Sequence, residues 1–221
     1  MIKLVIFDLD GTLADTLDDI GDGVNAMLCD FSFPTLTRKD INANINRGPR
    51  ELIRLCLPAE MRENEEFISK ALEIYKGYYN LCYCNKTALY PGIQEALSSL
   101  SDNGVKLAVL SNKQDDAVKV IVSHLLPEIP FEYVLGHAEF PTKPSPDAAN
   151  YIMTSIGVLP SETAFVGDSH IDMQTAVNCG SHPVGVTWGY RSRDVLIENG
   201  ARYLIDRPAD LKNIPSFCSG N

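Results

Sequence analysis

The stretch Val5-Ile6-Phe7-Asp8-Leu9-Asp10-Gly11-Thr12 joins a short apolar run to a group of acidic and small residues. A run of this length, rich in β-branched and aromatic side chains, predicts a strand buried on both faces, as in a parallel sheet. Two aspartates two residues apart can approach one point if the chain curls, and the glycine after them permits the curl. We therefore expect a buried strand whose carboxyl end presents two carboxylates.

Other apolar runs of the same kind follow along the chain, and helical patterns separate most of them. The predicted strands are Lys3–Phe7, Lys106–Leu110, Tyr133–Leu135, Thr163–Val166, Pro183–Thr187 and Tyr203–Ile205. Helical patterns cover Ile93–Asn103, Asp147–Ile156 and Ile171–Cys179, and a glycine follows each of them, as is common at helix C-termini. This alternation predicts an α/β fold with a doubly wound, Rossmann-like parallel sheet and helices on both faces.

The pattern changes between Asp15 and roughly Thr87, where strand signals stop and helical periodicity takes over. The helical stretches are Thr16–Leu28, Pro49–Leu57 and Glu60–Tyr79. The sequence therefore predicts an α/β core of residues 1–14 and 88–221 and a helical insertion of residues 15–87. We expect hinges near Ala14–Thr16 and Ala88–Gly92.

The composition limits the possible functions. The chain has 221 residues, 45% of them hydrophobic, and a formal net charge of −10. Its length allows a substantial buried core, whereas its acidic surface disfavours nucleic acid and anionic membranes as partners. A phosphorylated metabolite would be repelled too, unless a bound cation and nearby basic residues reverse the field in one cleft.

Cysteine usage and hydropathy favour a cytoplasmic protein. The cysteines lack CxxC pairs and zinc-site spacing, which favours reduced thiols over disulfides or zinc. They are Cys29, Cys56, Cys82, Cys84, Cys179 and Cys218. The apolar start of the chain is interrupted by Asp8 and Asp10, too early for a signal peptide or a membrane span.

Polar residues follow three of the predicted strands. Asp8 and Asp10 follow the first, Ser111-Asn112 follows Lys106–Leu110, and Gly167-Asp168 leads from Thr163–Val166 toward Asp172. Open α/β sheets bind ligands beyond the carboxyl ends of their strands, so we expect these side chains to gather there. Each motif alone has an ordinary alternative: a turn at the Asp-x-Asp-Gly stretch, and a helix N-terminus at Ser111 and at Asp172.

Four motifs together resemble the haloacid dehalogenase superfamily of phosphohydrolases, and more narrowly its phosphoglycolate phosphatase-like branch. They are DLDGT at 8–12, LSN at 110–112, TKPSPD at 142–147 and VGDSHIDM at 166–173, in the family's order. The resemblance covers nearly the whole chain. It implies that the helical insertion is a cap and that the substrate is a small phosphate monoester, with phosphoglycolate the leading candidate.

The resemblance also implies roles for the motif residues. Asp8 would attack phosphorus and form an aspartyl-phosphate. Asp10 would protonate the leaving group and later activate water. Thr12 would fix the loop and belong to the phosphate-binding group with Ser111 and Asn112.

The resemblance further implies a bound Mg²⁺, for which carboxylate and carbonyl oxygens are suitable ligands. The Asp8 side chain, the Asp10 carbonyl and the Asp168 side chain would hold it, and Asp172 would hold a metal-bound water or orient the loop. Lys143 precedes Pro144, which favours an extended backbone. By resemblance its ammonium would neutralise the nucleophile and the transferring phosphoryl group.

The helical insertion is expected to determine substrate choice and is harder to interpret. Arg47-Gly48-Pro49-Arg50 is the candidate substrate loop, with Arg47 and Gly48 as its candidate site residues, because an arginine on a turn before a helix can bind a carboxylate in bidentate fashion. Surface arginines beside an ordinary helix start are an equally good interpretation. Tyrosines 75, 78, 79 and 83, together with Trp188 and Tyr190, are expected to pack. His170 has no assigned role.

Several other functions remain open on the sequence. A phosphomutase or a pyrophosphatase would use the same scaffold and the same aspartates. Dehalogenation is disfavoured, because it has no need of an acid/base at Asp10. A catalytically silent phosphometabolite-binding protein would be expected to lack at least one of the core residues, but Asp8, Asp10, Lys143 and Asp168 are all present. The chain could be a monomer or a homodimer.

Overall fold

In the computed structural model of the chain, residues 1–45 and 47–217 are described, and Cys218 lies outside them. The core is a parallel six-stranded sheet in the order β5-β4-β1-β6-β7-β8. Its strands are β1 (Leu4–Phe7), β4 (Lys106–Gln114), β5 (Phe131–His137), β6 (Thr163–Gly167), β7 (His182–Val186) and β8 (Tyr203–Ile205). The predicted α/β fold is confirmed, and β1 lies at the centre of the sheet.

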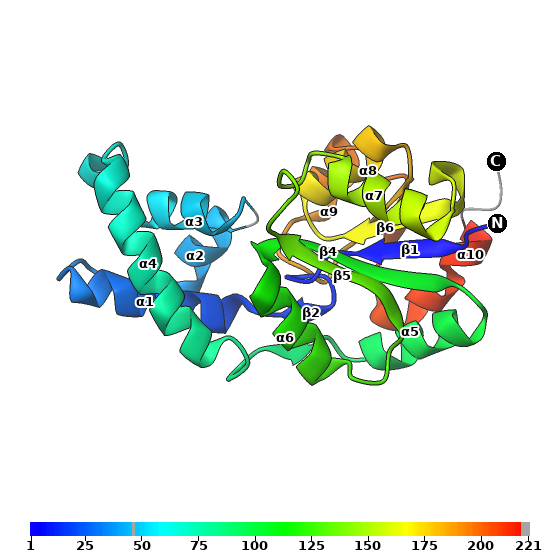
Figure 1. Ribbon diagram of the computed structural model, residues 1–221, viewed down its shortest axis with the longest axis horizontal. Helices are drawn as coiled ribbons and strands as arrows, with labels where there is room; N and C mark the ends of the chain where they lie inside the picture. Colours follow the sequence, from blue (N-terminus) through cyan, green and yellow to red (C-terminus); the bar gives the residue numbers. More distant parts are fainter. Residues whose placement is uncertain (46, 218–221) are drawn as a thin grey trace.

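Alternate residues of β1 pack on opposite faces of the sheet. Leu4 and Ile6 belong to a buried cluster with α7 and α8, whereas Val5 and Phe7 belong to one with α5 and α6. The helices of the core are α5 (Ile93–Asp102), α6 (Asp115–Leu125), α7 (Asp147–Ile156), α8 (His170–Cys179), α9 (Arg193–Glu198) and α10 (Ile214–Phe217). Figure 1 shows α7 and α8 above the sheet and α5 and α6 below it. Burial on both faces explains why the strands are continuous apolar runs.

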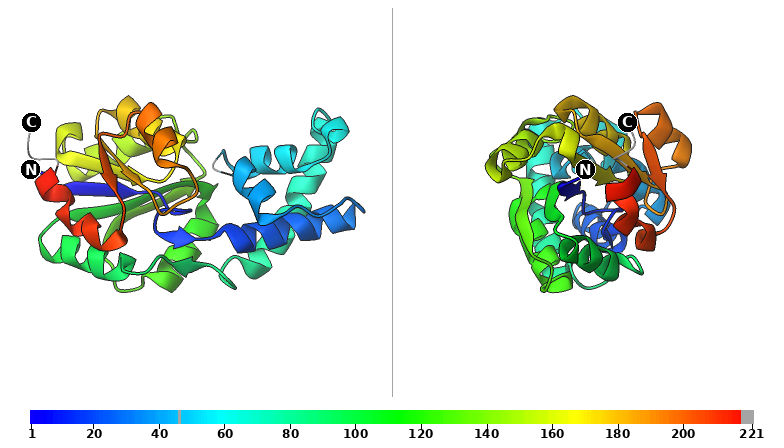
Figure 2. Two further views of the ribbon diagram at one scale, coloured as in Figure 1. Left: turned by 180° about the vertical axis from the view of Figure 1, so that it is seen from behind. Right: turned by 90° about the vertical axis from the view of Figure 1, so that its right-hand side faces the viewer.

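The helical insertion stands at one end of the core and has its own hydrophobic cluster. Its helices are α1 (Leu17–Asp30), α2 (Arg38–Asn44), α3 (Pro49–Cys56) and α4 (Glu65–Cys82). Figures 1 and 2 both show these helices beyond the end of the sheet that is opposite the N-terminus, which is the end to which β1 runs. The cap therefore faces the carboxyl ends of the strands.

A short ribbon joins the two segments that connect core and cap. Outgoing β2 (Ala14–Asp15) pairs antiparallel with returning β3 (Ala88–Leu89). The remaining elements are the 3₁₀ turns η1 (Ala59–Met61), η2 (Pro160–Glu162) and η3 (Pro208–Asn213). In the part of the chain that the structure describes, no helix has both the length and the apolar character needed to span a bilayer.

The sequence analysis did not predict α2, α6, α9, α10 or the β2–β3 ribbon, and two of the predicted elements differ in ways that matter here. Strand β4 continues to Gln114, so Ser111 and Asn112 lie within the strand rather than after it; its pairing with β5 becomes irregular between Leu110 and Gln114. Helix α4 begins at Glu65 rather than at residue 60, because the Asn64 side chain accepts a hydrogen bond from the Phe67 amide and caps the helix there.

Candidate active site

Side chains from separate strand ends meet between the sheet and the cap. Asp8 and Asp10 follow β1, Ser111 and Asn112 lie near the end of β4, and Asp168 follows β6. Asp172 lies in the first turn of α8, and Lys143 comes from the connection between β5 and α7. The sheet order places β4 and β6 on either side of β1. The convergence therefore follows directly from the topology.

Lys143 joins two buried carboxylates. Its Nζ donates to Asp8 Oδ1 at 2.8 Å and to Asp172 Oδ1 at 2.7 Å, and its side chain is 4% exposed. Burial by itself lowers the pKa of Lys143, but the charges of Asp172 and Asp8 outweigh that effect and hold the pKa above its usual value. The ammonium is therefore a permanent positive charge beside Asp8.

Asn112 fixes the backbone that carries Lys143. Its Oδ1 accepts from the Lys143 amide at 2.7 Å, and its Nδ2 donates to the Lys143 carbonyl at 3.0 Å. Ser111 lines the pocket described below, and its hydroxyl accepts from the Lys113 amide at 3.2 Å. The Asn112 amide group thus positions Lys143, which the sequence alone did not indicate.

Asp172 is held by the start of its own helix. Ser169 donates to Asp172 Oδ2 from its amide at 3.1 Å and from its hydroxyl at 2.6 Å, and the Asp172 amide donates back to the hydroxyl at 3.3 Å. This capping box directs Asp172 Oδ1 toward Lys143. Gly167 is needed for the close approach, because a Cβ there would lie 2.2 Å from Asp172 Cβ.

Asp168 is fixed from two other segments. The Tyr190 amide donates to its Oδ2 at 2.7 Å, and the Thr12 hydroxyl donates to its Oδ1 at 3.4 Å. Gly11 has a φ of +86°, and a Cβ on it would lie 2.4 Å from Asp168 Oδ2. Thr12 is fully buried and contacts Asp168, and its carbonyl accepts from Trp188 Nε1 at 3.0 Å.

The three buried aspartates form a compact acidic cluster. One carboxylate oxygen each from Asp8, Asp168 and Asp172 lies within 4.8 Å of the other two. Burial, followed by repulsion from Asp172, raises the pKa of Asp8 to about 7 despite Lys143. Burial and the charges of Asp172 and Asp8 also raise the pKa of Asp168. A buried excess of negative charge on hard oxygen donors fits a divalent cation such as Mg²⁺.

Asp10 lines the same pocket as Asp8 and is held by two donors of its own. The Thr16 hydroxyl and the Lys113 ammonium both donate to its Oδ1, the latter at 2.7 Å. Lys113 lies over the Tyr79 ring, 5.2 Å from its centroid. Sequence reasoning missed Lys113, although its place directly after Ser111-Asn112 was a usable signal.

A pocket between core and cap opens over these residues. Its core wall contains Asp8, Asp10, Ser111, Lys113 and Lys143, with other polar groups. Its cap wall is mainly apolar and aromatic. It includes Ile20, Ile45, Gly48, Pro49, Leu52, Tyr75 and Tyr79. A polar floor under an apolar roof suits a small ligand whose charged end is held by the core.

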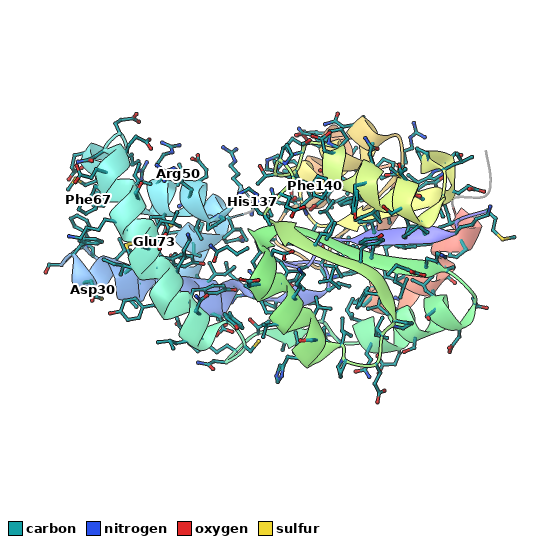
Figure 3. All side chains as sticks on the ribbon, viewed as in Figure 1. Asp30, Arg50, Phe67, Glu73, His137 and Phe140 are labelled. Carbon is teal, nitrogen blue, oxygen red and sulfur yellow. The ribbon has the colours of Figure 1, made fainter. Side chains whose placement is uncertain are left out.

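The structure separates the members of the proposed substrate loop. Gly48 lines the pocket, but Arg47 is exposed and is not part of its lining. Arg50, labelled on the cap in Figure 3, forms an ion pair with Glu65 and is not part of the pocket lining. His137 is labelled at the end of β5 that faces the cap.

A second contact between core and cap was also missed. Arg191, from the segment after β7, donates from Nη1 to the Asn42 carbonyl and to Asn42 Oδ1, both at 2.9 Å, and from Nη2 to the Ile45 carbonyl at 3.4 Å.

Burial, then repulsion from Arg191 and Arg47, lowers the pKa of His170, so this histidine is neutral near pH 7.

Known proteins resemble the chain over most of its length. A family model described as haloacid dehalogenase-like hydrolase matches residues 5–186. Phosphoglycolate phosphatase 1 of Pseudomonas aeruginosa is 31% identical over 213 residues, covering 95% of this chain and 78% of that protein. The phosphoglycolate phosphatase of Haemophilus influenzae strain 86-028NP is 31% identical over 218 residues, covering 96% of this chain and 97% of that protein.

A solved structure shares both fold and sequence. A crystal structure from Lactobacillus delbrueckii subsp. bulgaricus, provisionally assigned as a phosphoglycolate phosphatase, superposes with a TM-score of 0.88 and 31% identity, covering 96% of this chain and 97% of that chain. Since the family model spans most of the chain and the relatives align over nearly all of it, the chain belongs to the haloacid dehalogenase-like hydrolase family.

Proposed function

We propose that the protein is a magnesium-dependent phosphatase that hydrolyses a small phosphate monoester of the phosphoglycolate type through an aspartyl-phosphate on Asp8. The observation that carries the proposal is the buried contact of the Lys143 ammonium with Asp8 in a pocket that also contains Asp10. The relatives named phosphoglycolate phosphatase support this substrate class.

In the first step, a carboxylate oxygen of Asp8 attacks phosphorus, a P–O bond to Asp8 forms, and the P–O bond to the leaving alkoxide breaks. Asp10 gives the alkoxide its proton. In the second step, Asp10 takes a proton from water, a P–O bond to the water oxygen forms, and the P–O bond to Asp8 breaks. Inorganic phosphate is released and the Asp8 carboxylate is restored. Lys143 lowers the cost of bringing an anionic nucleophile to an anionic phosphoryl group.

Positioning residues complete the proposed site. The Ser111 hydroxyl binds a phosphoryl oxygen, while Asn112 holds the Lys143 backbone and Thr12 holds Asp168. The side chains of Asp8 and Asp168 and the carbonyl of Asp10 would hold Mg²⁺, with Asp172 beside them. The bound ion would supply positive charge to the transferring phosphoryl group.

The cap has a separate part in this proposal. Residues 15–87 close over the core of residues 1–14 and 88–221 and exclude water while the phosphoryl group is transferred.

The thiols of Cys29, Cys56, Cys82, Cys84 and Cys179 are free. Free thiols are typical of a reducing compartment, and we place the enzyme in the cytoplasm.

The test is phosphate release from para-nitrophenyl phosphate and phosphoglycolate in the presence of Mg²⁺. Asp8→Asn should abolish release while circular dichroism and the thermal midpoint stay close to those of the parent. Asp10→Asn should slow release by about 100-fold or more, as expected for the loss of a general acid/base. Asp116→Asn, at an exposed position on α6, is the matched control and should behave as the parent.

Two results would contradict the proposal. Turnover by Asp8→Asn at the parent rate would exclude Asp8 as the nucleophile. Isomerisation of a sugar monophosphate without free phosphate would identify a mutase instead.

A further inference from the structure

Lys113 is a buried cation for which the proposed reaction has no use. Its side chain is 7% exposed, and its Nζ donates to Asp10 Oδ1 at 2.7 Å. On the cap side, the ammonium lies over the Tyr79 ring at 5.2 Å. The aspartate and the aromatic ring together hold the ammonium in the wall of the pocket.

The charges of the pocket divide between two ends. Among the described residues that line it, the cations are Lys143 and Lys113. Lys143 is committed to Asp8 and Asp172, where the phosphoryl group would react. Lys113 contacts Asp10 and the cap, so it is available to a second charged group of the ligand.

Tyr79 supplies an independent observation. It is 3% exposed and lines the same pocket, yet its hydroxyl has no hydrogen-bond partner among the described residues. Burial raises the pKa of Tyr79 well above its ordinary value, so the hydroxyl keeps its proton and remains a donor. Buried donors nearly always have partners, and an acceptor on the substrate would provide one here.

We propose that Lys113 and the Tyr79 hydroxyl form the subsite that binds the carboxylate of a short phosphorylated acid. This inference rests on the proposed function and assigns its specificity. An ammonium has three donors, so Lys113 can contact Asp10 and a substrate carboxylate together.

The apolar cap wall strengthens this contact. Ile20, Ile45 and Leu52 line the pocket opposite its polar floor. They exclude water, and an ion pair is stronger where the local dielectric constant is low. A phosphate monoester that lacks a carboxylate would leave Lys113 without that second partner, so the subsite selects phosphorylated acids.

The test compares two substrates that differ at one end. 2-Phosphoglycolate and 2-hydroxyethyl phosphate have the same phosphate and two-carbon chain, but only the former has a carboxylate. In Lys113→Met, the ratio of their kcat/KM values should fall by at least about tenfold, because a hydrogen bond to a charged group is lost for one substrate only. Lys113→Met also removes the hydrogen bond to Asp10, but this loss affects the hydrolysis of both substrates and cancels in the ratio of their kcat/KM values.

A second measurement does not depend on phosphoryl transfer. Glycolate has the carboxylate without the phosphate, and its inhibition constant should rise about tenfold in Lys113→Met. Tyr79→Phe removes only the hydroxyl and should lower the substrate ratio several-fold, which keeps the inference testable if Lys113→Met does not fold. Lys119→Met is the matched control, because Lys119 is an exposed lysine on α6 outside the pocket lining.

Equal losses on both substrates in Lys113→Met would overturn the subsite, as would a fall in the ratio in Lys119→Met alone. A parent enzyme that hydrolyses phosphate monoesters with no preference for the acid would also refute it while leaving the phosphatase proposal intact. If the parent releases phosphate from no monoester, the phosphatase proposal itself fails.

Discussion

At Lys143 one ammonium faces more negative charge than it can neutralise. Asp8 and Asp172 both accept its hydrogen bonds, and Asp168 lies within the same cluster. Burial and mutual repulsion raise the pKa values of Asp8 and Asp168, so keeping these groups ionised costs folding free energy. The folded protein is therefore less stable than it would be without these buried charges, which the proposed reaction requires.

Asp168→Asn should therefore leave the metal-free protein as stable as the parent or more stable, and should reduce the stabilisation that Mg²⁺ provides. In EDTA, its thermal midpoint should equal or exceed that of the parent, because one repelling charge is gone. Mg²⁺ at 100 times its dissociation constant should raise the parent midpoint by about 5–10 °C and the variant midpoint by much less. Differential scanning calorimetry measures both; an equal shift on adding Mg²⁺ would show that Asp168 is not a ligand.

Among the elements, the connection between core and cap depends on one side chain of α1 as well as on the β2–β3 ribbon. Asp19 is fully buried and accepts from the Lys86 amide at 3.0 Å, from the Thr87 amide at 2.8 Å and from the Thr87 hydroxyl at 2.7 Å. The first cap helix therefore holds the segment that returns to the core. This contact limits the ways in which the cap can move.

Asp19→Ala should loosen this connection, because it leaves buried donors without an acceptor. We expect a loss of about 3 kcal/mol in the free energy of unfolding, measured by urea denaturation. Hydrogen exchange at the Lys86 and Thr87 amides should become faster.

Asp18→Ala is the neighbouring control. Asp18 forms an exposed ion pair with Arg38, which contributes less than about 1 kcal/mol. If Asp19→Ala were no more destabilising than Asp18→Ala, the role of Asp19 in the connection would be disproved.

In the whole molecule, Arg191 joins core and cap at a point away from the hinge. Its guanidinium reaches the backbone carbonyls of Asn42 and Ile45, at the end of α2 and just beyond it. Carbonyls at a helix C-terminus lack partners within the helix and carry partial negative charge, so a cation there is favourable. With the cap over the pocket, this contact joins the end of α2 to the core.

Arg191→Met should shift the population toward a more open cap. The KM for phosphoglycolate should rise about tenfold, since fewer molecules are in the competent arrangement, and small-angle scattering should show a larger radius of gyration. Arg193 lies two residues from Arg191 and forms an exposed ion pair with Asp206. Arg193→Met removes that pair and should change neither the KM nor the radius of gyration. An unchanged KM in Arg191→Met would show that this contact does not control closure.

Much of the fold could be predicted because its signals are local. Burial on both faces makes β1 and β6 continuous apolar runs, and Gly157 and Gly180 take the left-handed conformation directly after α7 and α8. The grouping of Asp8, Asp168 and Asp172 also follows from topology, since parallel strands end at one edge of the sheet.

The sequence by itself thus determined the six strands of the sheet, the helical character of the insertion and the residues near the strand ends. Only the tertiary structure decided which side chains pair there: Lys113 with Asp10, Asn112 with the Lys143 backbone, and Arg191 with the cap. Their partners are 31 to 149 positions distant in the sequence. The pairing depends on strand register, on the irregular end of β4 and on the seating of the cap, and no local sequence pattern encodes these.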